Sequence, residues 1–342
     1  MIRLADYVAQ FLVSKNVTNI FMLTGYGAMY INDAIELSGI RYYATRNEAT
    51  APMMAAAYAK LTGNIGVVCV TAGPGSTNAI PGLAEAWVDS APILIISGQV
   101  EYKHTTRYSR LPLRTFGTAE IDIIPIVQPL TKFATMVENP QQIRWILEKS
   151  FHLSISGRPG PVWIDIPLDI QNCMIDPDSL PGYTPDPDFY SPLNLDEVWA
   201  SFEKAKFPLL VAGQGIRQSK AITELIDFIE IMKVPLIFSR LGQDMIPHTH
   251  HYVFGHAGIK GSRYCKHIMN NADLVLVLGC RLSAQFVGHN FEAFNNAKVI
   301  VVDIDKNELL KPGVNLDTSI NADVKHFLHS MIKESYKKVL PD

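Results

Sequence analysis

Residues 46–99 constrain the fold more than any other stretch of this sequence. Within it, residues 65–71 and 92–97 are short apolar runs, typical of strands that are buried on both faces. Between them lie a glycine-rich turn at 73–78 and a helical stretch at 77–88. Strand, glycine turn, helix and strand make a βαβ unit, which requires a parallel sheet covered by helices on both faces. Ligands of such sheets bind where the strands end, and the glycine-rich turn lies at such an end.

The same alternation continues on both sides of this unit. Before a run of prolines, predicted strands cover 19–24, 40–45 and 162–166, and predicted helices cover 3–15, 28–37, 120–127 and 139–156. After the prolines, predicted strands cover 208–212, 234–239, 273–279 and 298–304, and predicted helices cover 221–232 and 323–337. The fold class is therefore α/β, with two doubly wound parallel-sheet domains.

A proline-rich stretch separates the two patterns. Five prolines fall between Asp176 and Pro192, where hydrophobic periodicity is almost absent, and this composition indicates an extended, semi-rigid linker. We expect a first domain at 1–170, a linker at 171–193 and a second domain at 194–342. A chain of 342 residues has ample length to bury a core in each domain.

The bulk composition argues against several classes of partner. A net charge of −3 does not provide the excess of basic residues that is typical of proteins that bind nucleic acid. The longest apolar runs fall well short of the roughly 20 residues that span a bilayer. The chain opens with an amphipathic helix, which leaves no room for a signal peptide. Its four cysteines lie far apart, without metal-ligand spacing, and fit a reducing compartment. We expect a cytoplasmic protein without a nucleic-acid, membrane or metal site.

Two glycine turns and one histidine cluster suggest other functions. Residues 25–27 and 213–215 each follow a predicted strand with the pattern Gly-x-Gly, but both lack the third glycine of the dinucleotide fingerprint. We interpret them as tight turns, which disfavours a nicotinamide-dependent oxidoreductase. His248, His250 and His251 cluster in a predicted exposed turn without acidic neighbours, so a metal site there is also disfavoured.

Glu48 heads a run of small residues and has two interpretations. It can be an acid that interacts with the dipole of the following helix, which stabilises the helix by a fraction of a kcal/mol. Alternatively, the small apolar residues after it indicate that the helix is buried, and a buried carboxylate requires a function. The small residues would also let another surface approach this helix closely.

These motifs together resemble the thiamine diphosphate enzymes, and most of all the acetolactate synthase (acetohydroxyacid synthase) group. In the first half the matching residues are Glu48, 66–71, 73–78, 92–99 and 156–162. In the second half they are 212–215, 271–274, 278–281 and 302–305. The resemblance covers nearly the whole sequence. It implies that the first domain binds the pyrimidine of the cofactor and that the second is the family's central domain.

The resemblance also implies roles for single residues. Glu48 would be the catalytic residue, hydrogen-bonded to N1′ of the aminopyrimidine and favouring its imino tautomer. The cofactor would perform the carbanion chemistry, while the protein orients it. The positions that match cofactor-binding residues of the family are Gly25, Tyr26, Gly27, Pro74, Asn78 and Gln99.

Several departures from the family pattern limit what the resemblance implies. The family's third domain holds Mg²⁺ and the diphosphate through a Gly-Asp-Gly motif, which is absent from this sequence. The resemblance therefore implies half of an active site, and three explanations stay open: a fragment, a subunit of a split enzyme, or a truncated gene. We expect this chain alone to be inactive. Residues 281–285 do not match the family's FAD-contacting run, so FAD is not expected; ADP, coenzyme A or no ligand in the second domain stay open.

Two functional hypotheses follow from the resemblance. The first is a carboligase or decarboxylase that acts on 2-oxoacids, with a separate chain as one possible source of the diphosphate-binding domain. The second is a non-catalytic paralogue that serves as an oligomerisation subunit. The helices at 49–59 and 77–88 match dimerising surfaces of the family, so we expect a homodimer or tetramer under either hypothesis. The basic stretch at 103–114 is either a site for an anionic substrate or, as we favour, a solvated loop or subunit contact.

Overall fold

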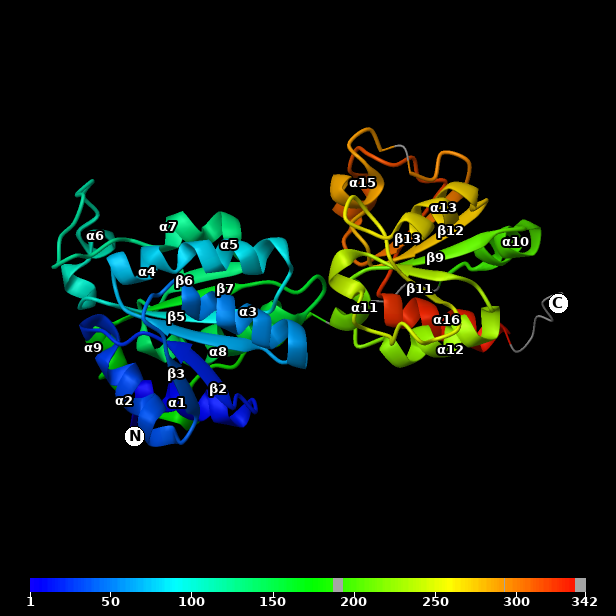
Figure 1. The fold of residues 1–342 in the computed structure, drawn as a ribbon. Coiled ribbons are helices and arrows are strands. Elements are labelled where there is room, and N and C mark those ends of the chain that lie inside the picture. Colours follow the sequence, from blue (N-terminus) through cyan, green and yellow to red (C-terminus); the bar gives the residue numbers. More distant parts are fainter. Residues whose placement is uncertain (187–192, 292, 336–342) are drawn as a thin grey trace. The chain divides into compact units, whose positions relative to one another are not determined.

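A computed structural model describes residues 1–186, 193–291 and 293–335. The chain divides into two compact units, Met1–Pro187 and Asp188–Asp342 (Figure 1). Each unit is an α/β domain with its own six-stranded sheet. The predicted fold class, two doubly wound parallel-sheet domains, is confirmed.

The first unit is built on a parallel sheet with the strand order β3-β2-β4-β5-β7-β6. Its strands are β2 (Asn19–Met22), β3 (Arg41–Ala44), β4 (Gly66–Val70), β5 (Ile93–Gln99), β6 (Phe133–Met136) and β7 (Val162–Pro167). The two central strands β4 and β5 are buried along their whole length, as their apolar composition predicts. Strand β6 was not predicted, because only one of its four residues is buried at this edge of the sheet.

Helices cover both faces of this sheet. The helices of this unit are α1 (Leu4–Ser14), α2 (Met29–Ser38), α3 (Thr50–Thr62), α4 (Pro74–Asn78), α5 (Ile80–Val88), α6 (Thr106–Ser109), α7 (Ile124–Val127), α8 (Ile143–Ile155) and α9 (Leu168–Gln171). Alternate residues of β4 face opposite cores: Val67 and Cys69 pack with α1, α2 and α8, whereas Val68 and Val70 pack with α3, α5 and α7. Figure 1 shows α5 and α7 on one side of the sheet and α1 and α2 on the other.

Helix α3 is only half buried, so the predicted burial of the whole helix is wrong. Its alanines face the core, where Gly82 of α5 comes so close that an added Cβ would lie 2.5 Å from Pro52 Cγ. The opposite face carries Met53, Met54 and Leu61, with exposed fractions of 38%, 36% and 77%. A helix of this length on the surface of a sheet presents one face to the core and one outward.

Residues 171–186 of the predicted linker belong to the first unit. Strand β8 (Met174–Ile175) pairs antiparallel with β1 (Ile2–Arg3), and Leu180 lies in the same hydrophobic core as α1. Residues 187–192 of the predicted linker lie outside the described residues. The proline count did not reveal these contacts, because single apolar residues between prolines give no periodic signal.

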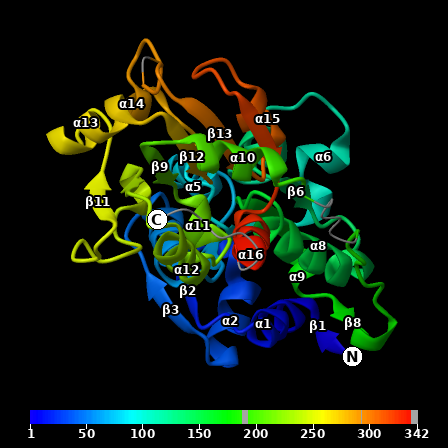
Figure 2. The ribbon, with the colours of Figure 1, turned by 90° about the vertical axis from the view of Figure 1, so that its right-hand side faces the viewer.

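The second unit repeats the architecture with the parallel strand order β11-β10-β9-β12-β13-β14. Its strands are β9 (Pro208–Ala212), β10 (Leu236–Phe238), β11 (Val253–His256), β12 (Leu274–Leu278), β13 (Lys298–Asp303) and β14 (Thr318–Asn321). Its helices are α10 (Asp196–Lys204), α11 (Gly215–Gln218), α12 (Ile222–Met232), α13 (Arg263–Asn271), α14 (Ala284–Val287), α15 (Lys306–Leu310) and α16 (Val324–Ser335). Helices α12 and α16 pack side by side (Figure 2). In the part of the chain that the structure describes, no helix is long and apolar enough to cross a bilayer.

Candidate active site

The candidate site lies at the carboxyl edge of the first sheet. The turn at 25–28 follows β2, Glu48 follows β3, the turn at 71–78 follows β4, and Gln99 ends β5. Because these four strands are parallel neighbours, their carboxyl ends meet along one edge. The fold therefore gathers the predicted site residues from segments that are far apart in the sequence.

Glu48 and Asn78 are in direct contact. The Asn78 Nδ2 group donates a hydrogen bond of 2.7 Å to Glu48 Oε2, and both residues are half-buried. The other carboxylate oxygen, Oε1, has no hydrogen-bond partner among the described residues. A Cβ added at Gly75 would lie 3.4 Å from Oε1 and 2.6 Å from Thr71 Cγ2, so glycine is required beside this oxygen. One oxygen of the acid is held by Asn78, and the other has no protein partner in the described part of the chain.

The turn at 25–27 packs tightly against the end of β4. The Gly27 N–H group donates to Thr71 Oγ1 at 3.1 Å, and a Cβ added at Gly25 would lie 2.5 Å from the Thr71 Cβ. A Cβ added at Gly98 would lie 2.0 Å from the Gly27 carbonyl oxygen. Glycine is therefore required here for close backbone packing. Tyr26 points outward, with 70% of its surface exposed.

Gly73 begins the second turn of the site in a left-handed conformation. Its φ is +56°, and an added Cβ would lie 1.8 Å from the Ala119 carbonyl oxygen. Both facts exclude a larger residue. Pro74 follows as an exposed first residue of α4, where its missing N–H costs no helical hydrogen bond. Ala119 thus contacts this turn through its backbone.

Gln99 is engaged inside the protein. Only 1% of the residue is exposed, and its Nε2 donates to the Ile121 carbonyl at 3.0 Å and to Asp165 Oδ2 at 3.1 Å. Its Oε1 accepts a hydrogen bond from the Val100 N–H group at 3.0 Å. The structure thus gives Gln99 a bridging position between β7 and the segment after α6, and its predicted contact with a cofactor stays a prediction.

Asp165 is a buried acid that sequence reasoning missed. It is fully buried in β7, where Ser97 Oγ donates to its Oδ1 at 2.6 Å and the indole of Trp163 donates to Ser97 Oγ at 2.8 Å. Burial raises the pKa of Asp165 to about 7, although the bonds from Ser97 and Gln99 favour the charged form. An acid inside an otherwise apolar predicted strand is the signal that would have identified it.

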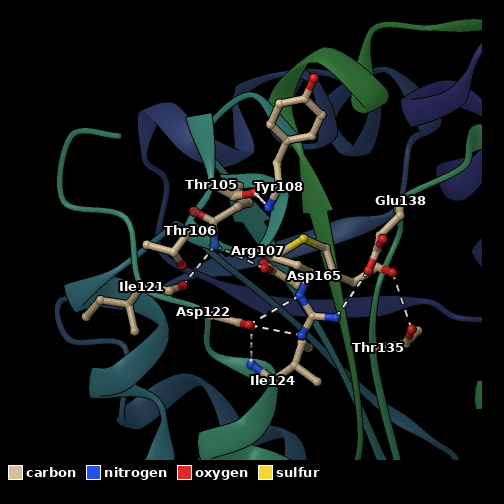
Figure 3. A network of polar contacts seen from close by, with 12 residues as sticks. Thr105, Thr106, Arg107, Tyr108, Ile121, Asp122, Ile124, Thr135, Glu138 and Asp165 are labelled. Carbon is tan, nitrogen blue, oxygen red and sulfur yellow. Dashed lines mark hydrogen bonds and ion pairs between the residues drawn. The ribbon is translucent and has the colours of Figure 1, made fainter. Parts of the chain in front are cut away.

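The segment between β5 and α7 is held over this edge by charged groups (Figure 3). Arg107 donates to both oxygens of Asp122, at 3.2 and 3.0 Å, and to Glu138 at 3.2 Å. Glu120 is 1% exposed and accepts hydrogen bonds from the Thr106 backbone and hydroxyl. The predicted solvated loop is therefore an ordered element at its anchor points, with Arg110 and Arg114 exposed between them.

The other motifs are structural in the described residues. Gly213 packs against the backbone of Gly279, because an added Cβ would lie 2.1 Å from the Gly279 carbonyl oxygen. His250 lies 3.1 Å from Glu230, an acidic neighbour that is distant in the sequence. Across residues 1–186, 193–291 and 293–335, no group of three or more His, Cys, Asp or Glu side chains could hold a metal ion.

Comparisons with known proteins support this arrangement. A family model described as "Thiamine pyrophosphate enzyme, N-terminal TPP binding domain" matches residues 2–124. A second, described as "Thiamine pyrophosphate enzyme, central domain", matches residues 195–331. The first match includes the turn at 25–27, Glu48 and the turn at 71–78, which all lie at the carboxyl edge described above.

Curated relatives match along nearly the whole chain. An "Acetolactate synthase" of Arthrospira platensis is 34% identical over 334 residues, which cover 94% of this chain and 56% of the relative. A "Probable acetolactate synthase large subunit" of Methanococcus aeolicus is 30% identical, covering 96% of this chain and 55% of the relative. "Acetolactate synthase isozyme 3 large subunit" of Escherichia coli is 31% identical, covering 96% and 57%. The chain spans about half the length of the curated relatives it matches. It belongs to the thiamine diphosphate-dependent enzyme family and is similar to the acetolactate synthases.

Proposed function

We propose that this chain supplies the pyrimidine-binding half of the active site of an acetolactate synthase-like enzyme, a carboligase or decarboxylase that acts on 2-oxoacids. The observation that carries the proposal is the Glu48 carboxylate, held by Asn78 on one oxygen and open on the other, beside the turn at 73–78. The unit Met1–Pro187 would be the pyrimidine-binding domain, and the unit Asp188–Asp342 the central domain.

The residues at the edge of the first sheet fit thiamine diphosphate. Glycines at 25, 27 and 75 let the two turns pack closely around Thr71 and Ala72, and the only carboxylate among the predicted site residues lies beside Gly75. Gly25, Tyr26, Gly27, Pro74 and Asn78 would contact the ring, and Gln99 would support it through its contacts with the segment after α6. When bound, the cofactor supplies the electron sink for decarboxylation and carbon–carbon bond formation.

The catalytic contribution of this chain would be the handling of one proton. Glu48 Oε1 would form a hydrogen bond to N1′ of the aminopyrimidine, sharing a proton with that weakly basic nitrogen. The bond from Asn78 keeps Oε2 in place, so that Oε1 is directed toward the ligand. A neutral side chain at position 48 could not accept this proton.

Magnesium and the diphosphate would be held by a third domain, on this polypeptide or on another. Oxygen ligands of the kind that Mg²⁺ prefers would come from that domain. For the second unit we propose no FAD: Arg281, which stands in the run that differs from the family, donates to Glu308 at 3.1 Å.

We also propose self-association through α3 and α5. Their outer faces expose Met53, Met54 and Trp87, the last with 40% of its surface exposed. Neighbouring apolar side chains of this size on a helical surface are typical of protein interfaces. A homodimer, or a tetramer built from it, would bury them, and sedimentation at tens of micromolar tests this. For the compartment we propose the cytoplasm, because all four cysteines are unbridged thiols.

Calorimetric titration with thiamine diphosphate and Mg²⁺ tests the proposed function. The chain is titrated alone and in a mixture with a diphosphate-binding domain, and Glu48→Gln is compared with the wild type in an activity assay. We expect tight binding only in the mixture, and a loss of activity of at least about 100-fold in Glu48→Gln. Absence of binding in both conditions would instead favour the non-catalytic oligomerisation subunit.

A further inference from the structure

Gln171 holds the turn of the candidate site from a distant part of the chain. It is the last residue of α9 and is fully buried. Its Nε2 donates two hydrogen bonds of 2.7 Å, one to the Gly27 carbonyl and one to the Ile166 carbonyl at the end of β7. A single amide group thus ties the turn after β2 to the end of a strand three positions away in the sheet.

The Gln171 side chain is poorly explained by stability alone. Its Oε1 is buried and has no hydrogen-bond partner in the described part of the chain. An unsatisfied buried oxygen costs free energy, whereas an apolar side chain of the same length would avoid this cost. The two bonds that the amide makes are therefore the reason to have glutamine here, and one of them ends on the turn.

Both polar groups of Gly27 are held by side chains. Thr71 accepts from its N–H group, and Gln171 donates to its carbonyl. Gly98 lets the turn approach β5, because any side chain there would collide with the same carbonyl. These contacts fix the peptide plane at position 27 relative to the end of β4, from which the turn at 73–78 continues. A ring that contacts both turns requires this relative placement.

We propose that Gln171 is a positioning residue of the candidate active site, which holds the turn at 25–27 in the orientation that the cofactor ring meets. The identity of the ligand rests on the proposed function, whereas the contact between Gln171 and the turn does not. Gln171 would touch no reacting atom and would act only through the Gly27 peptide.

Gln171→Met tests this, because methionine has nearly the same length and no donor. Ser154→Ala is the matched control: Ser154 is also fully buried in the first unit, and its hydroxyl donates to the Gly160 carbonyl at 3.0 Å. Amide hydrogen exchange by mass spectrometry is followed for residues 23–31, and thiamine diphosphate binding with Mg²⁺ is titrated in the full chain and its mixtures. We expect about tenfold faster exchange in the turn and about tenfold weaker binding for Gln171→Met, with neither change in Ser154→Ala.

Two outcomes would overturn the inference. One is unchanged exchange of residues 23–31 in Gln171→Met. The other is faster exchange with unchanged affinity, in conditions where the wild type binds the cofactor. If the wild type bound no cofactor in any condition, the proposed function would fail, and the exchange measurement would still decide whether Gln171 fixes the turn.

Discussion

The two units carry glycine turns at the carboxyl ends of similar parallel sheets, yet the turns have different surroundings. In the second unit, Gly213 and Gly215 pack directly on the backbone of Gly279. In the first unit, the turn at 25–27 packs on the backbone of Gly98, and it is held in addition by the side chains of Thr71 and Gln171. Close backbone packing is therefore common to both turns, whereas the side-chain hydrogen bonds to Gly27 distinguish the first.

The charged groups at the carboxyl edges of the two sheets also have different partners. In the second unit, Arg281 and Lys311 both pair with Glu308, so the acid at this edge has basic partners. In the first unit, Glu48 has an amide as its partner and keeps one oxygen open. The comparison shows that similar sheets do not imply similar sites. A carboxylate without a basic partner beside a glycine turn is a more specific sign of a ligand site than the glycine turn itself.

Gly73→Ala should have the largest effect on stability. The substitution adds a Cβ where φ is +56° and the Ala119 oxygen would lie 1.8 Å away, so we expect the first unit to lose about 3 kcal/mol or more. Gly39→Ala is the control that separates backbone strain from crowding, since Gly39 has a φ of +76° and an added Cβ there would have no neighbouring atom within 4 Å. It should cost about 1–2 kcal/mol. Urea unfolding measures both, and equal costs would show that crowding at Gly73 is relieved.

Gly213→Ala extends this prediction to the second unit. The added Cβ would lie 2.1 Å from the Gly279 oxygen, so we expect a loss of similar size, confined to the second unit. Tryptophan fluorescence during urea unfolding reports on both units, through Trp87, Trp145 and Trp163 in the first and Trp199 in the second. A loss of thiamine diphosphate binding in this variant, with the first unit folded, would contradict the contrast between the two turns.

Asp165→Asn should change how stability depends on pH. Burial raises the folded-state pKa of Asp165 from 3.8 to about 7, so its contribution to stability is complete below about pH 4 and is lost as the pH rises toward 7. The loss is at most about 4 kcal/mol. Asparagine cannot ionise, so the stability of the variant relative to the wild type should increase as the pH rises from 4.5 to 8. The exposed Asp178→Asn serves as control, and parallel pH curves for Asp165→Asn and the wild type would contradict the assignment.

Glu120→Gln should loosen the segment that contacts Gly73. The buried carboxylate accepts from Thr106 and, at 3.0 Å, from the Phe116 N–H group. Glutamine offers one acceptor in place of two, so we expect a loss of about 1–3 kcal/mol. Tryptic cleavage at the exposed Arg110 and Arg114 should become faster. An unchanged cleavage rate would show that the other anchors suffice.

Arg281→Ala should have the smallest effect. The Arg281 side chain is 51% exposed, and pairs of this kind contribute about 0–1 kcal/mol. Thermal unfolding should therefore shift little in this variant, and less at high salt than at low salt. A loss above about 2 kcal/mol would mean that the charges of the second unit are coupled more strongly than their exposure implies.

Much of the fold could be predicted because the central strands carry unmistakable apolar runs. Strands β4 and β5 and their helices follow directly from residues 65–99. Among the edge strands, β3 was predicted from residues 40–45 although its four residues are exposed, whereas β6, β11 and β14, which are short and partly exposed, were not predicted. The sequences of these three strands have few apolar residues and resemble loops.

The candidate site was predictable only in part, for a similar reason. Glu48, Asn78 and the glycines lie in local motifs that can be read along the chain. Asp165 is visible as an acid in an apolar strand, but the partners of Asp165 and Gln171 lie 66 to 144 residues away, and such contacts leave no local pattern. Gln99 illustrates the same limit. Its motif is visible in the sequence, but the hydrogen-bond partners of its side chain are not.

Hydrogen exchange of the whole chain, with and without thiamine diphosphate and Mg²⁺, tests most directly whether the first edge and not the second holds the cofactor. The measurement is made in a condition where calorimetry shows binding. We expect slower exchange at residues 25–29, 47–50 and 73–78, and unchanged exchange at 213–216 and 279–282. Protection at the turns of the second unit without protection at the first would contradict the assignment.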